Sequence, residues 1–356
     1  MKVAFFDAKH GYGLFEDRNQ GPCSLAVAST SDGGSTFSPP APITGSSCDS
    51  YLGGPLATSL SFDDHGDGFA FDPSLFITHD GGNTWSEVSS FNPVLDVVPL
   101  GYSVWALHGS CSNASTPVCS FGIEESSDGG KTWTDHPLPE TGNSTSYTDL
   151  VRTSASSAFL VAASLIYQQI GQAPNEAVTL LSTTDRGESW QTVSSAPCVG
   201  RGWSIDLSRA PDGALWLVCG GQPGAGNQIK SVARSLDGGR TWVQGPCAVG
   251  LPIQRFLECL GSAHMFAGYL GDLVALSDTT AFIDGGRNFL QVSHDGGVTW
   301  SRTNPVIGDG DLGVGGLYFA NPNTGWVIYG VENPAATLWH TTDGGSTWRE
   351  VWSQNG

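Results

Sequence analysis

Short apolar runs, separated by turns rich in Gly, Asn and Asp, repeat along the whole chain. In the C-terminal repeat, apolar runs at 316–319 and 325–329 flank an Asn-Pro-Asn-Thr turn, a third run follows at 337–340, and a fourth begins at Trp348. Short runs of this kind, bounded by turn residues, are typical of strands. An earlier segment has the same plan, with runs at 60–62, 68–71 and 74–77. The pattern predicts an all-β chain of four-stranded units, whose strands we call A to D.

One turn recurs seven times, with the form Ser/Thr-x-Asp-x-Gly-x-Thr/Ser-aromatic. Each copy falls between the predicted strands C and D of one unit. Successive copies lie about 50 residues apart, a spacing that indicates a propeller or an array of repeats. The aspartates of the seven copies are Asp32, Asp80, Asp128, Asp185, Asp237, Asp295 and Asp343.

Each residue of this turn has a structural reason. A short carboxylate accepts hydrogen bonds from the backbone N–H groups of its own turn, so the aspartate fixes the bend. The glycine two residues later, Gly34 in the first copy, can adopt a positive φ without steric cost. We expect the final aromatic side chain to wedge between neighbouring sheets. We therefore interpret the seven aspartates as structural rather than catalytic or metal-binding.

The recurring turn is the Asp-box, or BNR, repeat. Seven copies predict one seven-bladed β-propeller of four-stranded blades over residues 1–356, with the Asp-box turns between strands C and D. The expected blades cover residues 1–45, 46–92, 93–140, 141–196, 197–247, 248–306 and 307–356.

The segment 317–348, with the sequence LYFANPNTGWVIYG followed by LWHTTDGGSTW, resembles the repeat of photosystem II assembly/stability factor-like proteins. More distantly, the chain is similar to sortilin-type receptors, sialidases and xyloglucanases, which are also built from Asp-box propellers. The first resemblance implies a propeller that docks a protein partner with one face. The resemblance to sialidases and xyloglucanases implies a carbohydrate-active enzyme.

The charge balance is strongly acidic, with 34 Asp and Glu against 15 Lys and Arg and a net charge of −19. Such a charge repels nucleic-acid phosphates and anionic lipid, so we expect no nucleic-acid partner. The negative charge favours a neutral or cationic ligand, or a metal. The alternative interpretation is that the acidity only keeps a secreted protein soluble. The longest apolar run, at 158–167, is too short to span a bilayer, so we expect no membrane insertion.

Eight cysteines fall in the B–C and D–A connections, at the ends of the blades opposite the Asp-boxes. Their even number and their position in loops indicate disulfides and an oxidising compartment, hence a secreted or periplasmic protein. Zinc is a weaker interpretation because no Cys-x-x-Cys occurs. Proximity along the chain predicts the pairs Cys23–Cys48, Cys111–Cys119, Cys198–Cys219 and Cys247–Cys259. Either these disulfides hold a binding surface, or they restrain the longest loops.

Four aspartates take equivalent positions near the starts of predicted A strands, where the other blades have Lys2, Ser59 and Gly316. They are Asp96, Asp149, Asp206 and Asp272. Because strand A lines the channel of a propeller, these carboxylates would ring its mouth. Two of them, at about 5 Å or about 6.5–9.5 Å, would suit a glycosidase. Clustered oxygens would also suit a structural calcium ion. The third interpretation is that they are hydrated channel-lining residues.

Aromatic and cationic residues near the same rim are candidate ligand contacts, because rings stack on sugars and arginines clamp carboxylates. They are Tyr51, Tyr147, Arg201, Trp203 and Arg255. The sequence thus favours a monomeric, extracytoplasmic propeller that binds carbohydrate or protein at the disulfide-bearing face, without a cofactor other than a possible calcium ion. The alternative is a glycoside hydrolase, or a related carbohydrate-active enzyme, with paired carboxylates among the four aspartates.

Overall fold

The computed structural model describes most of the chain, with gaps in several connections. The described residues are 1–17, 23–48, 56–63, 65–111, 119–139, 145–166, 175–195, 198, 204–221, 230–245, 270–284, 289–307, 314–330 and 336–354. In these residues the secondary structure consists of strands, turns and bends, without helices. No helix in this part of the chain could therefore cross a bilayer.

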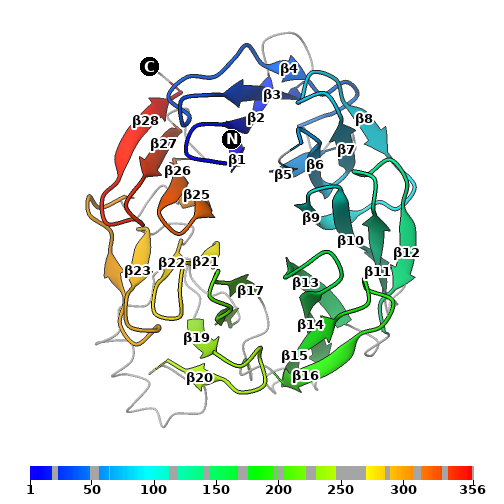
Figure 1. The fold of residues 1–356 in the computed structure, drawn as a ribbon, viewed down its shortest axis with the longest axis vertical. Helices are drawn as coiled ribbons and strands as arrows, with labels where there is room; N and C mark the ends of the chain where they lie inside the picture. The colour runs from blue at the N-terminus through cyan, green and yellow to red at the C-terminus, as the bar shows by residue number, and fades with distance from the viewer. Residues whose placement is uncertain are drawn as a thin grey trace. The chain divides into compact units, whose positions relative to one another are not determined.

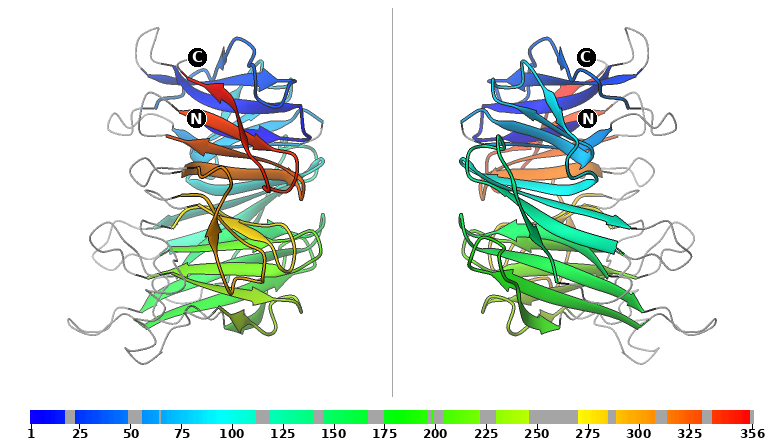
Figure 2. Two further views of the ribbon diagram at one scale, coloured as in Figure 1. Left: turned by 90° about the vertical axis from the view of Figure 1, so that its left-hand side faces the viewer. Right: turned by 90° about the vertical axis from the view of Figure 1, so that its right-hand side faces the viewer.

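The strands form seven four-stranded antiparallel sheets, and within each sheet the strands follow one another in chain order (Figures 1 and 2). Sheets one to three contain β1 (Lys2–Phe5), β2 (Gly11–Asp17), β3 (Ser24–Thr30) and β4 (Ala41–Pro42); β5 (Ala57–Phe62), β6 (Gly68–Pro73), β7 (Leu75–Thr78) and β8 (Ser86–Val88); and β9 (Val94–Leu100), β10 (Ser103–Cys111), β11 (Cys119–Ser126) and β12 (Thr134–Pro137).

Sheets four to seven contain β13 (Thr145–Arg152), β14 (Ala158–Ile166), β15 (Asn175–Thr183) and β16 (Gln191–Ser195); β17 (Ser204–Arg209), β18 (Leu215–Gly220), β19 (Lys230–Ser235) and β20 (Val243–Gln244); β21 (Leu273–Ala275), β22 (Ala281–Ile283), β23 (Gln291–Ser293) and β24 (Ser301–Arg302); and β25 (Val314–Asn321), β26 (Thr324–Tyr329), β27 (Thr337–Thr341) and β28 (Arg349–Ser353). Seven four-stranded antiparallel blades confirm the predicted fold class, an all-β propeller.

Every Asp-box forms the same set of hydrogen bonds, shown here by the second copy. The Thr78 hydroxyl donates to Asp80 Oδ1 (2.8 Å) and accepts from the Gly82 N–H (3.0 Å). Two residues after Gly82, Thr84 donates its N–H to Asp80 Oδ1 (2.9 Å) and its hydroxyl to Asp80 Oδ2 (2.6 Å). Because the motif satisfies its own donors and acceptors, the turn forms wherever the sequence occurs. The boxes of the other blades have equivalent bonds.

The box also binds the A–B turn of its own blade. The Gly81 N–H donates to Gly66 O (3.2 Å) in the second blade, and the Gly129 N–H donates to Tyr102 O (2.9 Å) in the third. The fourth box has Arg186 where the others have their first glycine, and Arg186 keeps this bond, to Ser156 O, at a φ of 64°. Each blade therefore has a box end, formed by the A–B and C–D turns, and an opposite end that carries the B–C and D–A connections.

The free energy of unfolding should fall as the pH falls from about 4 to about 2, because the box aspartates bind protons less readily in the folded state. Hydrogen bonds from the Thr or Ser four residues on lower the pKa to about 2 in Asp80, Asp128, Asp185 and Asp237. In the unfolded chain an aspartate has a pKa of about 3.9, so the unfolded state binds more protons between these values. Urea unfolding at pH 4, 3 and 2 measures the effect, and the Asp128→Asn variant should show a shallower dependence. Equal stability at all three pH values would contradict this assignment.

Apolar side chains fill the space between consecutive sheets, which explains why the middle strands are buried on both faces. Four of the seven box aromatic residues lie in these clusters, as predicted. Trp85 of the second box packs with Leu14 and Val27 of the first blade, and Trp133 packs with Phe69 and Ile77 of the second. Trp300 and Trp348 have equivalent positions in later blades.

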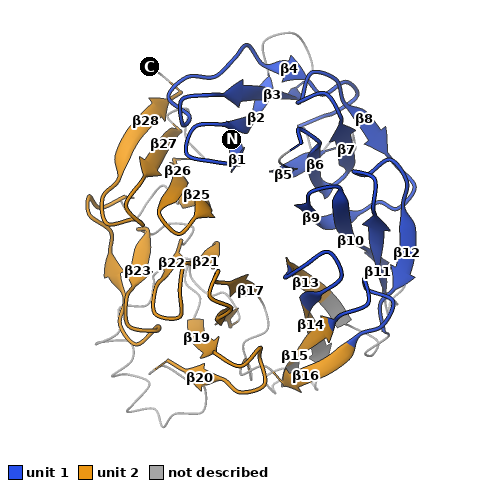
Figure 3. Ribbon diagram, in the orientation of Figure 1, with its two compact units in different colours: residues 1–143, 152–159, 183–190 blue, residues 144–151, 160–182, 191–356 orange. Residues whose placement is uncertain are grey.

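The chain divides into two compact units (Figure 3). Unit 1 comprises residues 1–143, 152–159 and 183–190, and it contains the first three blades with the box and the A–B turn of the fourth. Unit 2 comprises residues 144–151, 160–182 and 191–356, and it contains most of the fourth blade with the last three. The assignment of residues 1–356 to a single domain stays a prediction.

Candidate functional site

The four candidate aspartates all lie on or beside the first strand of a sheet. Asp96 is on β9, Asp149 is on β13, Asp206 is on β17, and Asp272 directly precedes β21. Asp96 belongs to unit 1, whereas the other three belong to unit 2. Within unit 2, therefore, the structure shows how strand-A carboxylates of successive blades are used.

Two of these carboxylates connect neighbouring blades. Asp206 Oδ2 accepts a hydrogen bond from the backbone N–H of Leu273 in the next blade (2.6 Å). Asp272 Oδ2 accepts in turn from the N–H of Leu317 in the blade after that (3.2 Å). Strand A is an edge strand with unpaired backbone donors, and these carboxylates satisfy two of them. We call these two contacts, together with the bond from the Ala275 N–H to Ser208 Oγ (2.9 Å), the strand-A bridges.

Asp272 is also fixed from within its own blade. Its N–H donates to the Oδ1 of Asp284 (2.9 Å), and the Asp284 N–H donates to Asp272 O (3.0 Å). Asp284 is 2% exposed, and a side chain on Gly271 would collide with its carboxylate. A larger residue at position 271 would displace this carboxylate. Two hydrogen bonds to Asp284 thus tie down the backbone at Asp272.

Asp149 differs from the other three because its backbone is strained. Its φ is 54°, in the left-handed region that a non-glycine residue rarely adopts. Such conformations persist where the surroundings enforce them, and they cluster at binding and catalytic sites. The nearby Tyr147 is 3% exposed, so its ring lies inside the blade instead of on an open surface. A ligand-binding role for Tyr147 stays a prediction.

The other candidate ligand contacts lie outside the described residues, namely Tyr51, Arg201, Trp203 and Arg255. A calcium ion at the strand-A aspartates also stays a prediction. In the part of the chain that the structure describes, the groups of three potential metal ligands are Glu16 with Cys23 and Cys48, and His108 with Glu124 and Asp135. The first contains a disulfide. The second has no signal in the sequence, because its members come from three strands and share no local motif.

Two of the four predicted disulfides are present, and both lie at blade ends opposite the boxes. Cys23 precedes β3 and is bonded to Cys48, with Cα atoms 5.4 Å apart. Cys198 precedes β17 and is bonded to Cys219 near the end of β18, with Cα atoms 5.5 Å apart. Both Cα separations are in the normal range for disulfides. The first bond ties a B–C connection to the D–A connection that follows it, and the second ties a D–A connection to the end of strand β18.

The remaining two predicted cysteine pairs differ in what the structure describes. Cys111 and Cys119 lie directly opposite each other, as the last paired residues of β10 and β11. Cys247 and Cys259 lie outside the described residues. Both pairings stay predictions.

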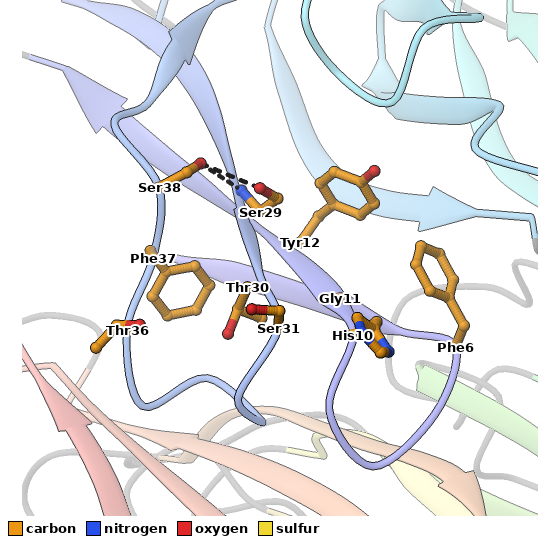
Figure 4. Close-up of a pocket in the computed structure, with 10 residues that line it drawn as sticks. All are labelled: Phe6, His10, Gly11, Tyr12, Ser29, Thr30, Ser31, Thr36, Phe37 and Ser38. Carbon is orange, nitrogen blue, oxygen red and sulfur yellow. Dashed lines mark hydrogen bonds between the residues drawn. The ribbon is translucent and has the colours of Figure 1, made fainter.

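A pocket of about 460 Å³ lies at the box end of the first blade (Figure 4). Phe37 on one side and Phe6 and Tyr12 on the other form part of its wall, and the Ser29 hydroxyl donates to Ser38 Oγ (3.2 Å). The remaining lining residues are His10, Gly11, Thr30, Ser31 and Thr36. None of the predicted site residues lines this pocket.

Comparisons with known proteins agree on the fold. The family model described as BNR/Asp-box repeat matches residues 291–302. A xyloglucanase from Paenibacillus sp is 26% identical over 200 residues, which is 50% of this chain but only 19% of that enzyme.

Solved structures of low sequence identity have the same architecture. The structure of YCF48 bound to D1 peptide has a TM-score of 0.53 and 18% identity, over 83% of this chain and 80% of that chain. A polysaccharide lyase, the PL25 ulvan lyase, has a TM-score of 0.59 and 12% identity, over 97% of this chain and 94% of that chain. The chain is a seven-bladed β-propeller with Asp-box turns, and its fold is similar to the folds of YCF48 and of the PL25 ulvan lyase.

Proposed function

We propose that this chain is an extracytoplasmic binding propeller, which takes a polysaccharide or polypeptide segment at the blade ends opposite the Asp-boxes. The observation that carries the proposal is the position of the disulfides Cys23–Cys48 and Cys198–Cys219 at those ends. A cross-linked loop has fewer conformations before a ligand binds, so it loses less conformational entropy when the ligand orders it. The free-energy cost of binding is therefore smaller.

The use of the carboxylates also supports binding over hydrolysis. The box aspartates bond their own turns, and Asp206 and Asp272 bond the backbone of the next blade. An Asp that holds the edge of a neighbouring strand is fixed for a structural task. With a net charge of −19, the protein suits a neutral polysaccharide or a basic peptide.

Two comparisons are consistent with either type of ligand. YCF48 has been solved with a D1 peptide, and the ulvan lyase has been solved with the saccharide -[GlcA(1-4)Rha3S]-. Disulfides persist in oxidising compartments, which supports a location outside the cytoplasm. Propellers have many unrelated functions, so structural similarity does not identify the ligand. We infer the ligand class from the net charge of the protein and from the cross-linked blade ends.

A second candidate function is carbohydrate cleavage, favoured by the 26% identity with the Paenibacillus xyloglucanase. The strained Asp149 is the residue best suited to it, because strain of this kind is often kept for a functional reason. Its partner would be another strand-A aspartate of the same unit. Hydrolysis of xyloglucan by the wild type, lost in Asp149→Asn and Asp206→Asn variants that circular dichroism shows to be folded, would establish this function. Hydrolysis that survives both substitutions would exclude this pair.

Removing the Cys198–Cys219 disulfide should weaken ligand binding by at least about tenfold, because the loop ends of blade five would then be ordered only on binding. We suggest screening neutral polysaccharides and basic peptides by calorimetry with the Cys198→Ser/Cys219→Ser double variant. The matched control is Asp237→Asn, which changes the box end of the same blade and should leave affinity unchanged. Far-ultraviolet circular dichroism checks that both variants keep their strands.

Two results would contradict the proposed binding surface. One is unchanged affinity after loss of the disulfide in a folded protein. The other is a loss of binding in Asp237→Asn that equals or exceeds the loss in the double cysteine variant. For a basic peptide, affinity should also fall between low and high salt, since attraction to an acidic surface is screened.

A further inference from the structure

Blade three carries a group of three metal-ligating side chains from three adjacent strands, β10, β11 and β12 (Figure 1). The register pairs Ala106 with Glu124, and Glu124 with Asp135. His108 follows Ala106 by two positions, so it projects from the same face of the sheet. His108, Glu124 and Asp135 are thus brought to one face by strand alternation, although they are far apart in sequence.

The donor atoms of this group are close enough to share an ion. His108 Nε2 lies 3.1 Å from Asp135 Oδ1, and one ligand atom of each of the three residues lies within 4.8 Å of the other two. Two ligands that each lie about 2.1 Å from a first-row transition ion are separated by about 3.0–3.4 Å. The His108–Asp135 separation is within that range before any ion binds.

Glu124 is the most buried member of the group, with 9% of its surface exposed. Burial raises the pKa of Glu124, and the nearby Asp135 raises it further, while His108 and His136 act in the opposite direction. Burial disfavours the charged form of a carboxylate, and a bound cation would offset that cost.

A glycine makes room for the group. A Cβ at position 122 would lie 2.5 Å from His108 Nε2 and 2.6 Å from Asp135 Oδ1. Only glycine therefore lets these two side chains meet across β11. The His108 ring also packs 5.8 Å from the Phe91 ring, which itself contacts Trp133 at 5.3 Å. One side of the group is therefore apolar.

The other side of the group is open to water. The side chains of His108 and Asp135 are 21% and 51% exposed, which leaves an approach from solvent. An ion held here could complete its coordination with water molecules. One nitrogen and two carboxylate ligands suit zinc or another first-row transition ion. Calcium prefers six to eight oxygen ligands, so it fits this set less well.

We propose that blade three binds one divalent transition-metal ion, with zinc as the best fit, through His108 Nε2, a carboxylate oxygen of Glu124 and Asp135 Oδ1. The proposal is independent of the ligand-binding function above. The competing explanation is an ordinary His–Asp hydrogen bond. The first blade offers a matched example, in which His10 Nδ1 lies 2.9 Å from Asp7 Oδ2 and the pair belongs to no group of three ligands among the described residues.

The test is calorimetric titration of the oxidised full chain with Zn²⁺, Mn²⁺ and Ca²⁺. Wild type should bind one Zn²⁺ more tightly than Mn²⁺ or Ca²⁺, in line with the usual order for nitrogen and oxygen sites. Glu124→Gln and His108→Gln should each weaken Zn²⁺ binding by at least about tenfold. Asp7→Asn, the matched control, should leave the Zn²⁺ affinity unchanged.

A second measurement on wild type guards against variants that fold poorly. Co²⁺ bound in place of Zn²⁺ should give visible absorption bands of a low-symmetry site, and added Zn²⁺ should abolish them. The proposal is overturned if wild type binds no stoichiometric Zn²⁺. It is equally overturned if folded Glu124→Gln binds Zn²⁺ as tightly as wild type, because any ion would then be held elsewhere.

Discussion

Replacing Arg152 with methionine should lower the free energy of unfolding by about 3–4 kcal/mol, since two partly buried carbonyl acceptors would lose a charged donor. Arg152 ends β13 and is 8% exposed. Its Nη1 donates to Val98 O (2.9 Å) and Ser103 O (2.6 Å), and its Nη2 donates to Ser103 Oγ (2.7 Å). The guanidinium also lies over the Trp105 ring, 4.7 Å from its centroid. One side chain thus attaches the A–B turn of the fourth blade to the third blade.

Methionine keeps most of the apolar volume of arginine, so the experiment isolates the lost hydrogen bonds. Burial lowers the pKa of Arg152 to about 10, and the guanidinium is therefore still charged at neutral pH. Urea unfolding monitored by tryptophan fluorescence gives the free energy. Arg240→Met is the control, because Arg240 is exposed and donates only to Asp237 O in its own turn (3.0 Å), so a change within about 0.5 kcal/mol is expected. An equally small change at Arg152 would refute the assignment.

Replacing Trp216 with alanine should cost about 3–5 kcal/mol, the range for deleting a fully buried large side chain. Trp216 is 0% exposed and belongs to the cluster between the fifth and sixth blades. Its Nε1 donates to Ser277 O in the A–B turn of the sixth blade (2.9 Å), and its ring packs edge-on against Trp300 at 6.4 Å. The side chain therefore joins two blades by both packing and a hydrogen bond.

The Trp216→Phe variant separates these two contributions. It keeps most of the packing and loses the bond to Ser277 O, so the expected cost is about 1–3 kcal/mol. Thermal unfolding and urea unfolding of both variants measure the difference. If alanine and phenylalanine cost the same, the hydrogen bond alone carries the stabilisation and the packing argument fails.

The sequence was enough to predict the blades, because the Asp-box is a local motif. Its hydrogen bonds join residues within a few positions, as Thr78, Asp80 and Thr84 illustrate, so no distant part of the chain affects them. Once the boxes locate the C–D turns, the apolar runs between successive boxes can be assigned to the remaining strands of each blade. The positions of Asp96, Asp149, Asp206 and Asp272 on or beside first strands follow from the same alignment.

The roles of those aspartates could not be predicted in the same way. The bond from Leu273 to Asp206 depends on the relative height of two strands in different blades, which a single sequence does not specify. The burial of Tyr147 likewise depends on its neighbours in space. The group of His108, Glu124 and Asp135 depends on the register of β10, β11 and β12, which pairs residues far apart in sequence.

The strand-A bridges run in one direction only. Asp206 accepts a hydrogen bond from the sixth blade, and Asp272 of the sixth blade accepts one from the seventh. In both of these bridges the acceptor is in the earlier blade and the donor is in the later one. This is a head-to-tail interface, in which each blade presents one surface forward and a different surface backward. A chain cleaved in the D–A connection between Gln244 and Leu273 would therefore still have a link between the two blades, because the carboxylate of Asp206 would hold the N–H of Leu273. The covalent link between these blades would be replaced by a non-covalent one.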